Sequence, residues 1–131
     1  MEDLQVRTNA PPGGADATSG PCPLRTALSA IGGRWKPLVL NHLLQRPHGF
    51  GELSRALDGV SNKTLTTQLR ELERDKLISR TVCDDARRSV SYSLTEDGAS
   101  LKPVLRALID WGNWRIETGR VPAKNCGVEA D

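Results

Sequence analysis

The chain has 131 residues and a mass of 14.3 kDa, enough for one folded domain but not for a second hydrophobic core. Its formal net charge of +2 is too small to indicate nucleic-acid binding by itself, so the placement of the charges must decide. No apolar run approaches the ~18 residues of a membrane span, and the N-terminus lacks the apolar core of a signal peptide. We therefore expect a cytoplasmic protein without a membrane partner.

The two ends of the sequence differ in composition from its middle. Residues 1–20 contain a Pro-Pro-Gly-Gly run and almost no large apolar side chain after Val6, so burial cannot offset the entropy lost on ordering them. Residues 119–131 have a similar mixture of glycine, proline and polar side chains. We therefore predict a disordered tail at residues 1–20, one domain at residues 21–118 and a flexible tail at residues 119–131.

Three short helices are predicted in the first half of this domain. Apolar residues at helical spacing indicate a helix at residues 24–31, and a Gly-Gly pair follows it as a stop signal. The second helix covers residues 35–45, where Pro37 is tolerated because it falls in the first turn. The third helix covers residues 51–57, before an Asp-Gly turn.

A fourth helix is predicted to begin after Ser61, whose hydroxyl is placed to cap it, and to end near residue 76. Leu65, Leu69 and Leu72 form one apolar stripe along this helix, and its other side is polar and net positive. The ordinary explanation of such a helix is that its polar face only contacts water. A face of that kind usually carries glutamate and lysine, whereas the first ten residues of this region are rich in threonine and contain no acid.

The second half of the domain is predicted to form a β-hairpin and a long helix. Residues 77–83 and 89–94 have strand-like patterns and are joined by a charged tip. Thr95 is placed to cap a helix that reaches about Thr118, with a kink at Pro103. Its apolar residues cover more than one stripe, which is more than a small domain can bury, so we expect a partner surface on this helix.

This order of elements is that of a winged helix-turn-helix, so the predicted fold is mainly α with a small β-hairpin (α+β). In such a fold the fourth helix enters the major groove of DNA, and the hairpin, called the wing, meets the backbone or the minor groove. Asn62 and Gln68 can donate to and accept from base edges, and Arg70 can bridge two acceptors on guanine. The candidate residues on the helix are Ser61, Asn62, Lys63, Thr64, Thr66, Thr67, Gln68 and Arg70. Further candidates, mainly for phosphate contacts, are Arg74, Arg80, Arg87 and Arg88.

Other function classes fit the sequence less well. A winged helix that binds proteins would have an acidic or apolar recognition face, and this face is neither. An enzyme needs a nucleophile with a base, or paired carboxylates on convergent elements, whereas Asp84 and Asp85 lie on an exposed hairpin tip. His42 and His48 have no acidic or thiol partner at metal-ligand spacing. We expect double-stranded DNA as partner, no enzymatic activity, no metal and no cofactor.

Several short motifs keep unbroken spacing over about 90 residues. They are Cys-Pro-Leu at 22–24, Ile-Gly-Gly-Arg-Trp at 31–35, Phe-Gly-Glu-Leu at 50–53, Val-Ser-Asn-Lys-Thr-Leu at 60–65, Leu-Arg-Glu-Leu-Glu at 69–73, Tyr-Ser-Leu-Thr-Glu-Asp-Gly at 92–98 and Trp-Gly at 111–112. On these motifs the chain resembles the HxlR family of bacterial winged-helix regulators, which is similar to the MarR type.

The resemblance implies a homodimer, expected to act as a repressor, that binds a palindromic operator through two recognition helices about 34–36 Å apart. It places the dimer contact on the first and last helices, at Leu24, Leu28, Val104, Leu105, Leu108, Trp111 and Trp114. The wing departs from the family pattern. Family members often carry a proline-rich tip that ends in a basic residue, whereas this tip reads Asp-Asp-Ala-Arg-Arg-Ser, so the residues of the wing contact stay open.

Cys22 occupies the position of the family's N-terminal cysteine, through which several relatives sense oxidants, quinones or other electrophiles. The positive potential near a helix N-terminus, with Arg25 close by, favours the reactive thiolate. The alternative is an inert cysteine packed at the dimer interface. Cys83 and Cys126 have no family counterpart, and an odd number of cysteines without Cys-x-x-Cys spacing argues against a disulfide scaffold or a zinc site.

A non-covalent aromatic effector at the dimer interface is a second possibility for regulation. Trp35, Trp111 and Trp114 are the residues that would line its cavity. Such tryptophans are more often anchors of a core or an interface. Both readings remain open at the level of the sequence.

Overall fold

The computed structural model describes residues 20–121. Cys126 and almost all of the two predicted tails lie outside the described residues. The structure divides into two compact units at Gly32: the first ends with helix α2, and the second contains every later element. Within residues 20–121, no helix combines the length and the apolar character that crossing a membrane requires.

Helix α2, Pro23–Ile31, is the first predicted helix. Leu24 and Leu28 lie on it and are both exposed. The chain leaves the helix through Gly33, whose φ of 94° is readily adopted by glycine and rarely by other residues. The Gly-Gly pair therefore ends the helix as the sequence predicts.

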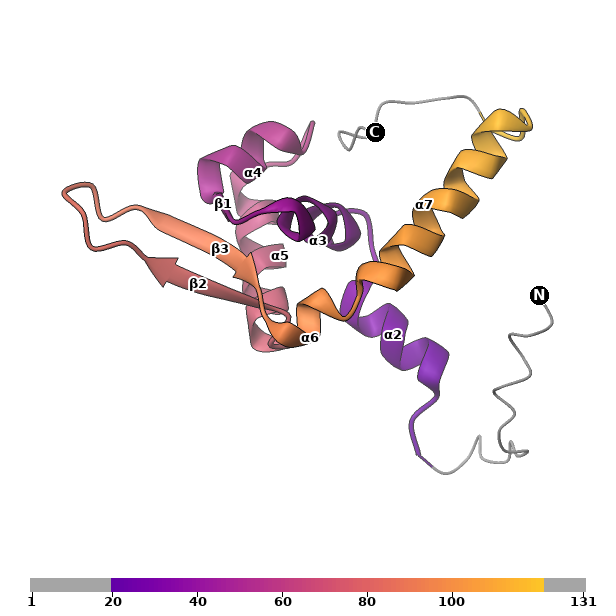
Figure 1. The fold of residues 1–131 in the computed structure, drawn as a ribbon, viewed down its shortest axis with the longest axis horizontal. Coiled ribbons are helices and arrows are strands. Elements are labelled where there is room, and N and C mark those ends of the chain that lie inside the picture. The colour runs from indigo at the N-terminus through magenta and orange to yellow at the C-terminus, as the bar shows by residue number, and fades with distance from the viewer. Residues whose placement is uncertain (1–19, 122–131) are drawn as a thin grey trace. The chain divides into compact units, whose positions relative to one another are not determined.

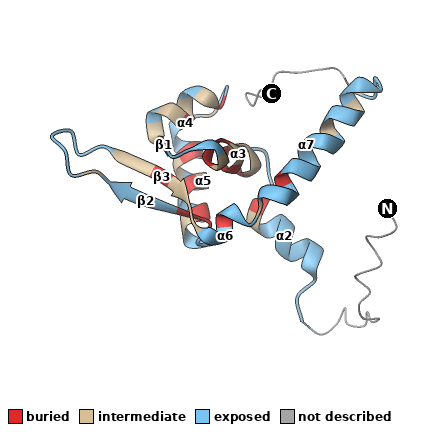
Figure 2. Cartoon of the chain, in the orientation of Figure 1, coloured by how far each residue is buried: buried red, intermediate tan, exposed pale blue. Residues whose placement is uncertain are grey.

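Three helices form the centre of the second unit (Figure 1): α3, Lys36–Gln45; α4, Phe50–Ala56; and α5, Asn62–Arg74. Pro37 lies in the first turn of α3, where its missing N–H has no helical partner to lose. Figure 2 shows buried residues gathered on α3 and α5, while the hairpin tip and most of α7 are exposed. The largest fully buried side chains are Val39, Leu40, Leu53, Leu57, Leu65, Leu69 and Leu72.

An antiparallel sheet lies beside these helices, with strand order β1-β3-β2. Strands β2, Ile78–Val82, and β3, Val90–Leu94, form the predicted hairpin, with Ile78 opposite Leu94 and Val82 opposite Val90. Strand β1, His48–Gly49, was not predicted. It is too short to show an alternating pattern, and it exists because His48 pairs with Tyr92 on β3.

The long last helix is broken into two, which corrects the prediction of one kinked helix. Helix α6, Glu96–Ala99, is capped by Thr95, whose hydroxyl accepts a hydrogen bond from the Gly98 amide at 3.0 Å. Helix α7, Lys102–Glu117, begins after the break. Pro103 lies in the first turn of α7, where a proline is favoured, so it begins a helix rather than kinking one.

Candidate nucleic-acid interface

Helix α5 has the cap and the buried stripe that the sequence predicts. The Ser61 hydroxyl accepts a hydrogen bond from the Thr64 amide at 3.0 Å, which satisfies one of the free amides of the first turn. Leu65, Leu69 and Leu72 are all buried. Because residues three and four apart share a helix face, burial of this stripe leaves the opposite face of α5 toward solvent.

The candidate DNA-binding residues of α5 differ in exposure. Asn62, Lys63 and Arg70 are exposed, whereas Thr66 and Gln68 are half-buried. Two threonine hydroxyls are engaged within the helix: that of Thr64 accepts from Ser61, and that of Thr67 donates to the Lys63 carbonyl at 3.1 Å. The guanidinium of Arg70 and the amide of Asn62 are therefore exposed and available for hydrogen bonds with a ligand.

An ion pair between a buried lysine and a half-buried glutamate ties α5 to α3. Lys36 is only 7% exposed, and its Nζ lies 2.8 Å from Oε1 of Glu71. The hydrogen bond from Lys36 lowers the pKa of Glu71, so the carboxylate stays ionised and its charge is offset. Sequence reasoning missed Lys36. The available signal was its place on the same helical face as Val39, Leu40 and Leu43, since a lysine on a buried stripe needs an acidic partner.

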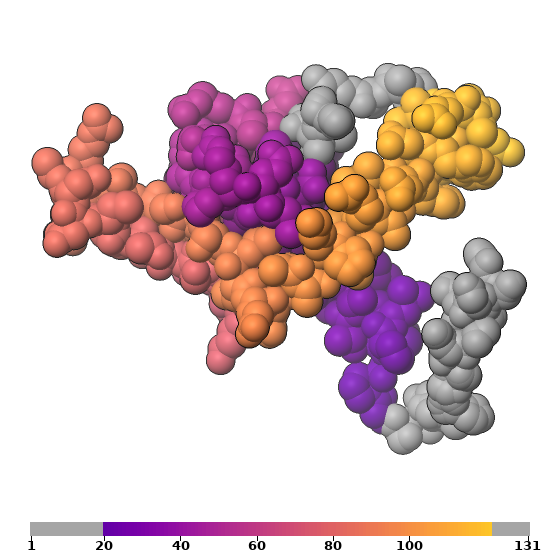
Figure 3. Space-filling view, in the orientation of Figure 1, coloured from indigo at the N-terminus to yellow at the C-terminus, as the bar shows by residue number. Residues whose placement is uncertain are grey.

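Three of the remaining cationic candidates lie on the wing, and the fourth lies on α5. Arg87 and Arg88 are exposed at the tip of the hairpin, which projects away from the helices of the second unit (Figures 1 and 3). Arg80 is exposed on β2 and stands opposite the buried Tyr92, so it lies on the strand rather than with the tip. Arg74 is exposed near the end of α5, and its Nε lies 3.4 Å from the Asp75 carboxylate.

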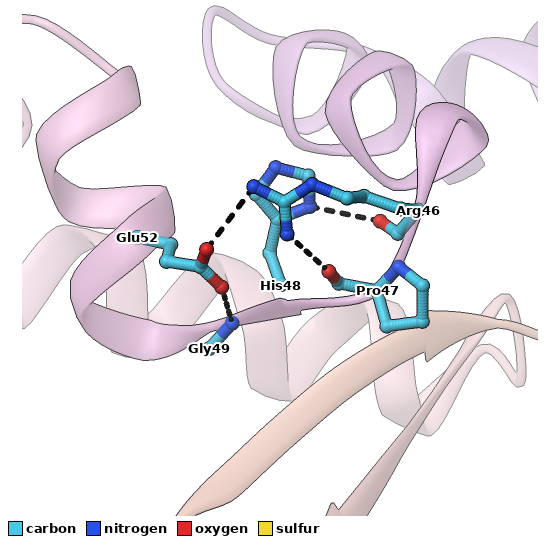
Figure 4. Close-up of polar contacts among 5 residues, drawn as sticks. All are labelled: Arg46, Pro47, His48, Gly49 and Glu52. Carbon is cyan, nitrogen blue, oxygen red and sulfur yellow. Dashed lines mark hydrogen bonds and ion pairs between the residues drawn. The ribbon is translucent and has the colours of Figure 1, made fainter.

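The connection from α3 to α4 is held by a small polar network (Figure 4). Glu52 accepts the Gly49 amide at 2.9 Å and pairs with Arg46 at 3.1 Å, and these contacts lower its pKa. Arg46 donates to the Pro47 carbonyl at 2.9 Å, and the His48 Nδ1 donates to the Arg46 carbonyl at 2.8 Å. The network sets the start of α4, the helix that precedes α5.

The two histidines lie close together, which their separation in the sequence did not indicate. Both His42 and His48 are buried, with ring centroids 5.8 Å apart in an edge-on arrangement. Among the described residues, no three His, Cys, Asp or Glu side chains are grouped so that they could hold a metal ion. The two rings contact each other between α3 and β1.

Helix α7 presents an exposed apolar surface. Trp111 is 59% exposed, and its ring stacks with that of Trp114 at a centroid distance of 6.4 Å. Arg115 lies over the Trp111 ring at 5.3 Å, and Arg120 over the Trp114 ring at 4.7 Å. The exposed apolar residues of α7 are Val104, Leu108, Ile109, Trp111, Trp114 and Ile116.

One of the residues predicted for the dimer interface is buried within its own unit. Leu105 is 3% exposed and belongs to the core of its own unit, so its inclusion in the dimer contact is corrected. The reason is that α7 has more than one apolar stripe, and Leu105 lies on the stripe that faces inward. Trp35 is half-buried, with the Arg34 guanidinium 5.0 Å from its ring centroid.

Cys22 and Cys83 are free thiols. Cys22 is exposed just before α2, and its carbonyl accepts the Thr26 amide at 2.9 Å, which is the first hydrogen bond of that helix. Cys83 is half-buried at the end of β2. The structure thus places Cys22 at a helix N-terminus, as expected.

A helix-turn-helix followed by an antiparallel hairpin defines a winged helix-turn-helix, the fold of a large class of DNA-binding transcriptional regulators. Residues 30–119 match the model of the HxlR-like helix-turn-helix family. The chain therefore belongs to the HxlR-like family of transcriptional regulators, and the resemblance seen in the sequence is confirmed. This assignment points to a DNA-binding regulator rather than an enzyme.

Individual relatives support the assignment. The HTH-type transcriptional regulator YdeP of Bacillus subtilis (strain 168) is 44% identical over 91 residues, which cover 70% of this chain and 71% of YdeP. The redox regulator HypR in its reduced form has a TM-score of 0.71 and 34% identity, covering 74% of this chain and 96% of HypR. Quinone-bound YodB from B. subtilis has a TM-score of 0.61 and 31% identity, covering 71% of this chain and 99% of YodB.

Proposed function

We propose that the protein is a homodimeric, sequence-specific repressor that places α5 of each protomer in the major groove of a palindromic operator. The observation that carries this proposal is the acid-free outer face at the start of α5, where Asn62, Lys63 and Arg70 are exposed above a buried leucine stripe. Amide and guanidinium groups can pair with two atoms of one base edge, and each good pair discriminates by roughly 1–3 kcal/mol.

The dimer in this proposal forms through α2 and α7. Leu24 and Leu28 on α2 are exposed, as are Leu108, Trp111 and Trp114 on α7. Large aromatic side chains are characteristic anchors of protein interfaces, where burial of their apolar area stabilises association. A second copy of the chain would cover both surfaces. The two recognition helices would then reach successive major grooves, about 34–36 Å apart.

The proposed signal is an electrophile that reacts with Cys22. Its thiol is exposed at the N-terminus of α2, where an electrophile in solution can reach it. Similarity to a redox regulator and to a quinone-bound regulator supports this choice. In the reaction with a quinone, the S–H bond of Cys22 breaks and the sulfur forms a C–S bond to a ring carbon. The electron pair of the ring C=C bond moves to one carbonyl oxygen, which takes up the thiol proton. The substituted ring carbon then loses its proton, and the second oxygen gains one, so that the product is a hydroquinone thioether.

A non-covalent aromatic effector is the second candidate for the signal. The stacked rings of Trp111 and Trp114 offer an exposed aromatic surface with Arg115 beside it, suited to a flat anionic molecule. This candidate predicts that an effector acts equally on the wild type and on a variant without the Cys22 thiol.

The deciding experiment is a mobility shift of the full chain on the intergenic DNA upstream of its own gene, with random duplex as competitor. Selective binding that diamide abolishes and dithiothreitol restores supports the thiol switch. A quinone should release DNA from the wild type and from Cys83→Ser, but not from Cys22→Ser. Equal release from Cys22→Ser would eliminate Cys22 as the sensor, and absence of selective binding would overturn the operator proposal.

A further inference from the structure

The tip of the wing is a closed turn in which one aspartate makes most of the contacts. The Cys83 amide donates to the Ser89 carbonyl at 2.7 Å, and the Arg88 amide donates to the Asp85 carbonyl at 3.0 Å. The Asp85 carboxylate also accepts two hydrogen bonds from Ser89, from the amide at 3.3 Å and from the hydroxyl at 3.2 Å. Both oxygens of Asp85 are therefore used within the turn.

Arg88 has a backbone conformation that needs such support. Its φ of 52° lies in the left-handed region, which is unfavourable for a residue with a Cβ. A residue stays there only when its surroundings hold it. The Arg88 amide precedes this φ rotation and the Ser89 amide follows it, and both amides donate hydrogen bonds to Asp85. They thereby hold the backbone that carries the side chains of Arg87 and Arg88.

The charge of Asp85 argues against a direct role at DNA. A carboxylate near phosphates repels them, so an acidic wing tip would weaken binding unless the residue had another task. Hydrogen bonds from Ser89 also lower the pKa of Asp85, so the carboxylate is ionised at neutral pH and remains a strong acceptor.

We propose that Asp85 is a positioning residue of the DNA-binding surface, which holds the wing turn so that Arg87 and Arg88 reach the DNA backbone. This inference rests on the proposed function, because it assumes that the wing contacts DNA. The two bonds of Asp85 to Ser89 stiffen a turn that contains no proline.

The test compares three variants of the full chain in operator binding over a range of salt concentrations. Asp85→Ala is expected to weaken binding by roughly tenfold and to reduce the salt slope by about 1 for each wing of the dimer, as loss of one phosphate contact does. Asp85→Asn keeps an acceptor for the Ser89 amide and a donor for its hydroxyl, so it should bind as tightly as the wild type or more tightly. Asp84→Ala is the matched control, because within residues 20–121 the Asp84 carboxylate has no hydrogen bond or ion pair.

A positioning role also requires that the effect of Asp85 pass through the arginines. In an Arg87→Ala, Arg88→Ala background, Asp85→Ala should cause no further loss of affinity. An equal further loss in that background would overturn the inference while leaving the proposed function intact. The same holds if Asp85→Ala tightens binding, which is the result expected of Asp84→Ala because that variant only removes a negative charge near the phosphates. Failure of the wild type to prefer its operator would overturn both.

Discussion

Arg70 is the residue on which sequence recognition is expected to depend most. It is exposed on α5, one position beyond the buried Leu69, so the start of the helix and the leucine stripe together determine where its guanidinium points. Its five N–H donors in a planar fork match the paired acceptors of guanine, which lysine, a single point charge, does not match.

Replacing Arg70 by alanine should therefore reduce affinity for the cognate operator by about 5- to 150-fold for each half-site of the proposed dimer, as expected for roughly 1–3 kcal/mol at one base pair. Affinity for random duplex should fall much less. Fluorescence anisotropy with both duplexes at one salt concentration measures the two effects. Equal losses on both would identify Arg70 as a phosphate contact.

Gly98 is a residue at which packing leaves no space for a side chain. A Cβ there would overlap the Leu77 backbone carbonyl oxygen and approach the Leu94 side chain to 3.0 Å. The same carbonyl accepts the Thr95 amide at 3.0 Å, so it cannot move without loss of a hydrogen bond. This close approach brings α6 against the start of β2.

We expect Gly98→Ala to destabilise the fold by about 1–3 kcal/mol, the usual range for overpacking. Chemical denaturation followed by circular dichroism measures the free energy of unfolding. Gly51→Ala is the control, because its Cβ would meet only the end of the flexible Arg55 side chain, at 3.3 Å. If both variants were equally stable, α6 would have to lie farther from β2 than the structure indicates.

At the scale of elements, carboxylates hold the helix-turn-helix together. Glu52 binds the Gly49 amide at the start of α4, and Glu71 joins α5 to α3 through Lys36. These contacts lower the pKa of both side chains from the ordinary value of 4.5. Such groups stabilise the folded state fully above their unfolded pKa, and this stabilisation is lost as the pH falls through the lower folded pKa.

The helix-turn-helix should accordingly lose stability below about pH 4.5, as the unfolded chain takes up protons that the folded chain binds less readily. Urea unfolding at a series of pH values measures this loss. Glu52→Gln and Glu71→Gln should each flatten the dependence, whereas Glu96→Gln serves as a control at an exposed position. An unchanged pH dependence in both test variants would show that other groups control acid unfolding.

At the scale of the whole molecule, α7 divides its apolar residues between two tasks. Leu105 faces the protomer's own core, whereas Trp111 and Leu108 are exposed. In the proposed dimer the exposed residues bind the second copy. Stability of the protomer and association of the dimer should therefore respond to different substitutions on the same helix.

Trp111→Ala is expected to shift the protein toward monomer in sedimentation velocity, with the protomer still folded. Leu105→Ala should instead lower the free energy of unfolding by about 2–5 kcal/mol, the usual effect of a core leucine truncation. Val82→Ala removes an exposed apolar side chain from the wing and should leave the dimer unchanged. A dimer that withstands Trp111→Ala would place the interface elsewhere.

The sequence by itself determined those features of the protein that depend on neighbours along the chain. The cap at Ser61, the stripe from Leu65 to Leu72 and the turn at Gly33 follow from helical periodicity, local hydrogen bonding and backbone sterics. These local rules are sufficient to predict the winged helix-turn-helix and to locate its recognition helix.

Only the tertiary structure decided which distant residues meet. Three contacts join segments whose local sequence patterns give no sign that they meet. They are the pairing of Lys36 with Glu71, the contact of His42 with His48 and the pairing that forms β1. Helical periodicity shows that α7 has several apolar stripes, but burial of Leu105 rather than Trp111 depends on how α7 packs against α3. Local sequence specifies the faces of an element, and packing between elements selects which of those faces becomes the core.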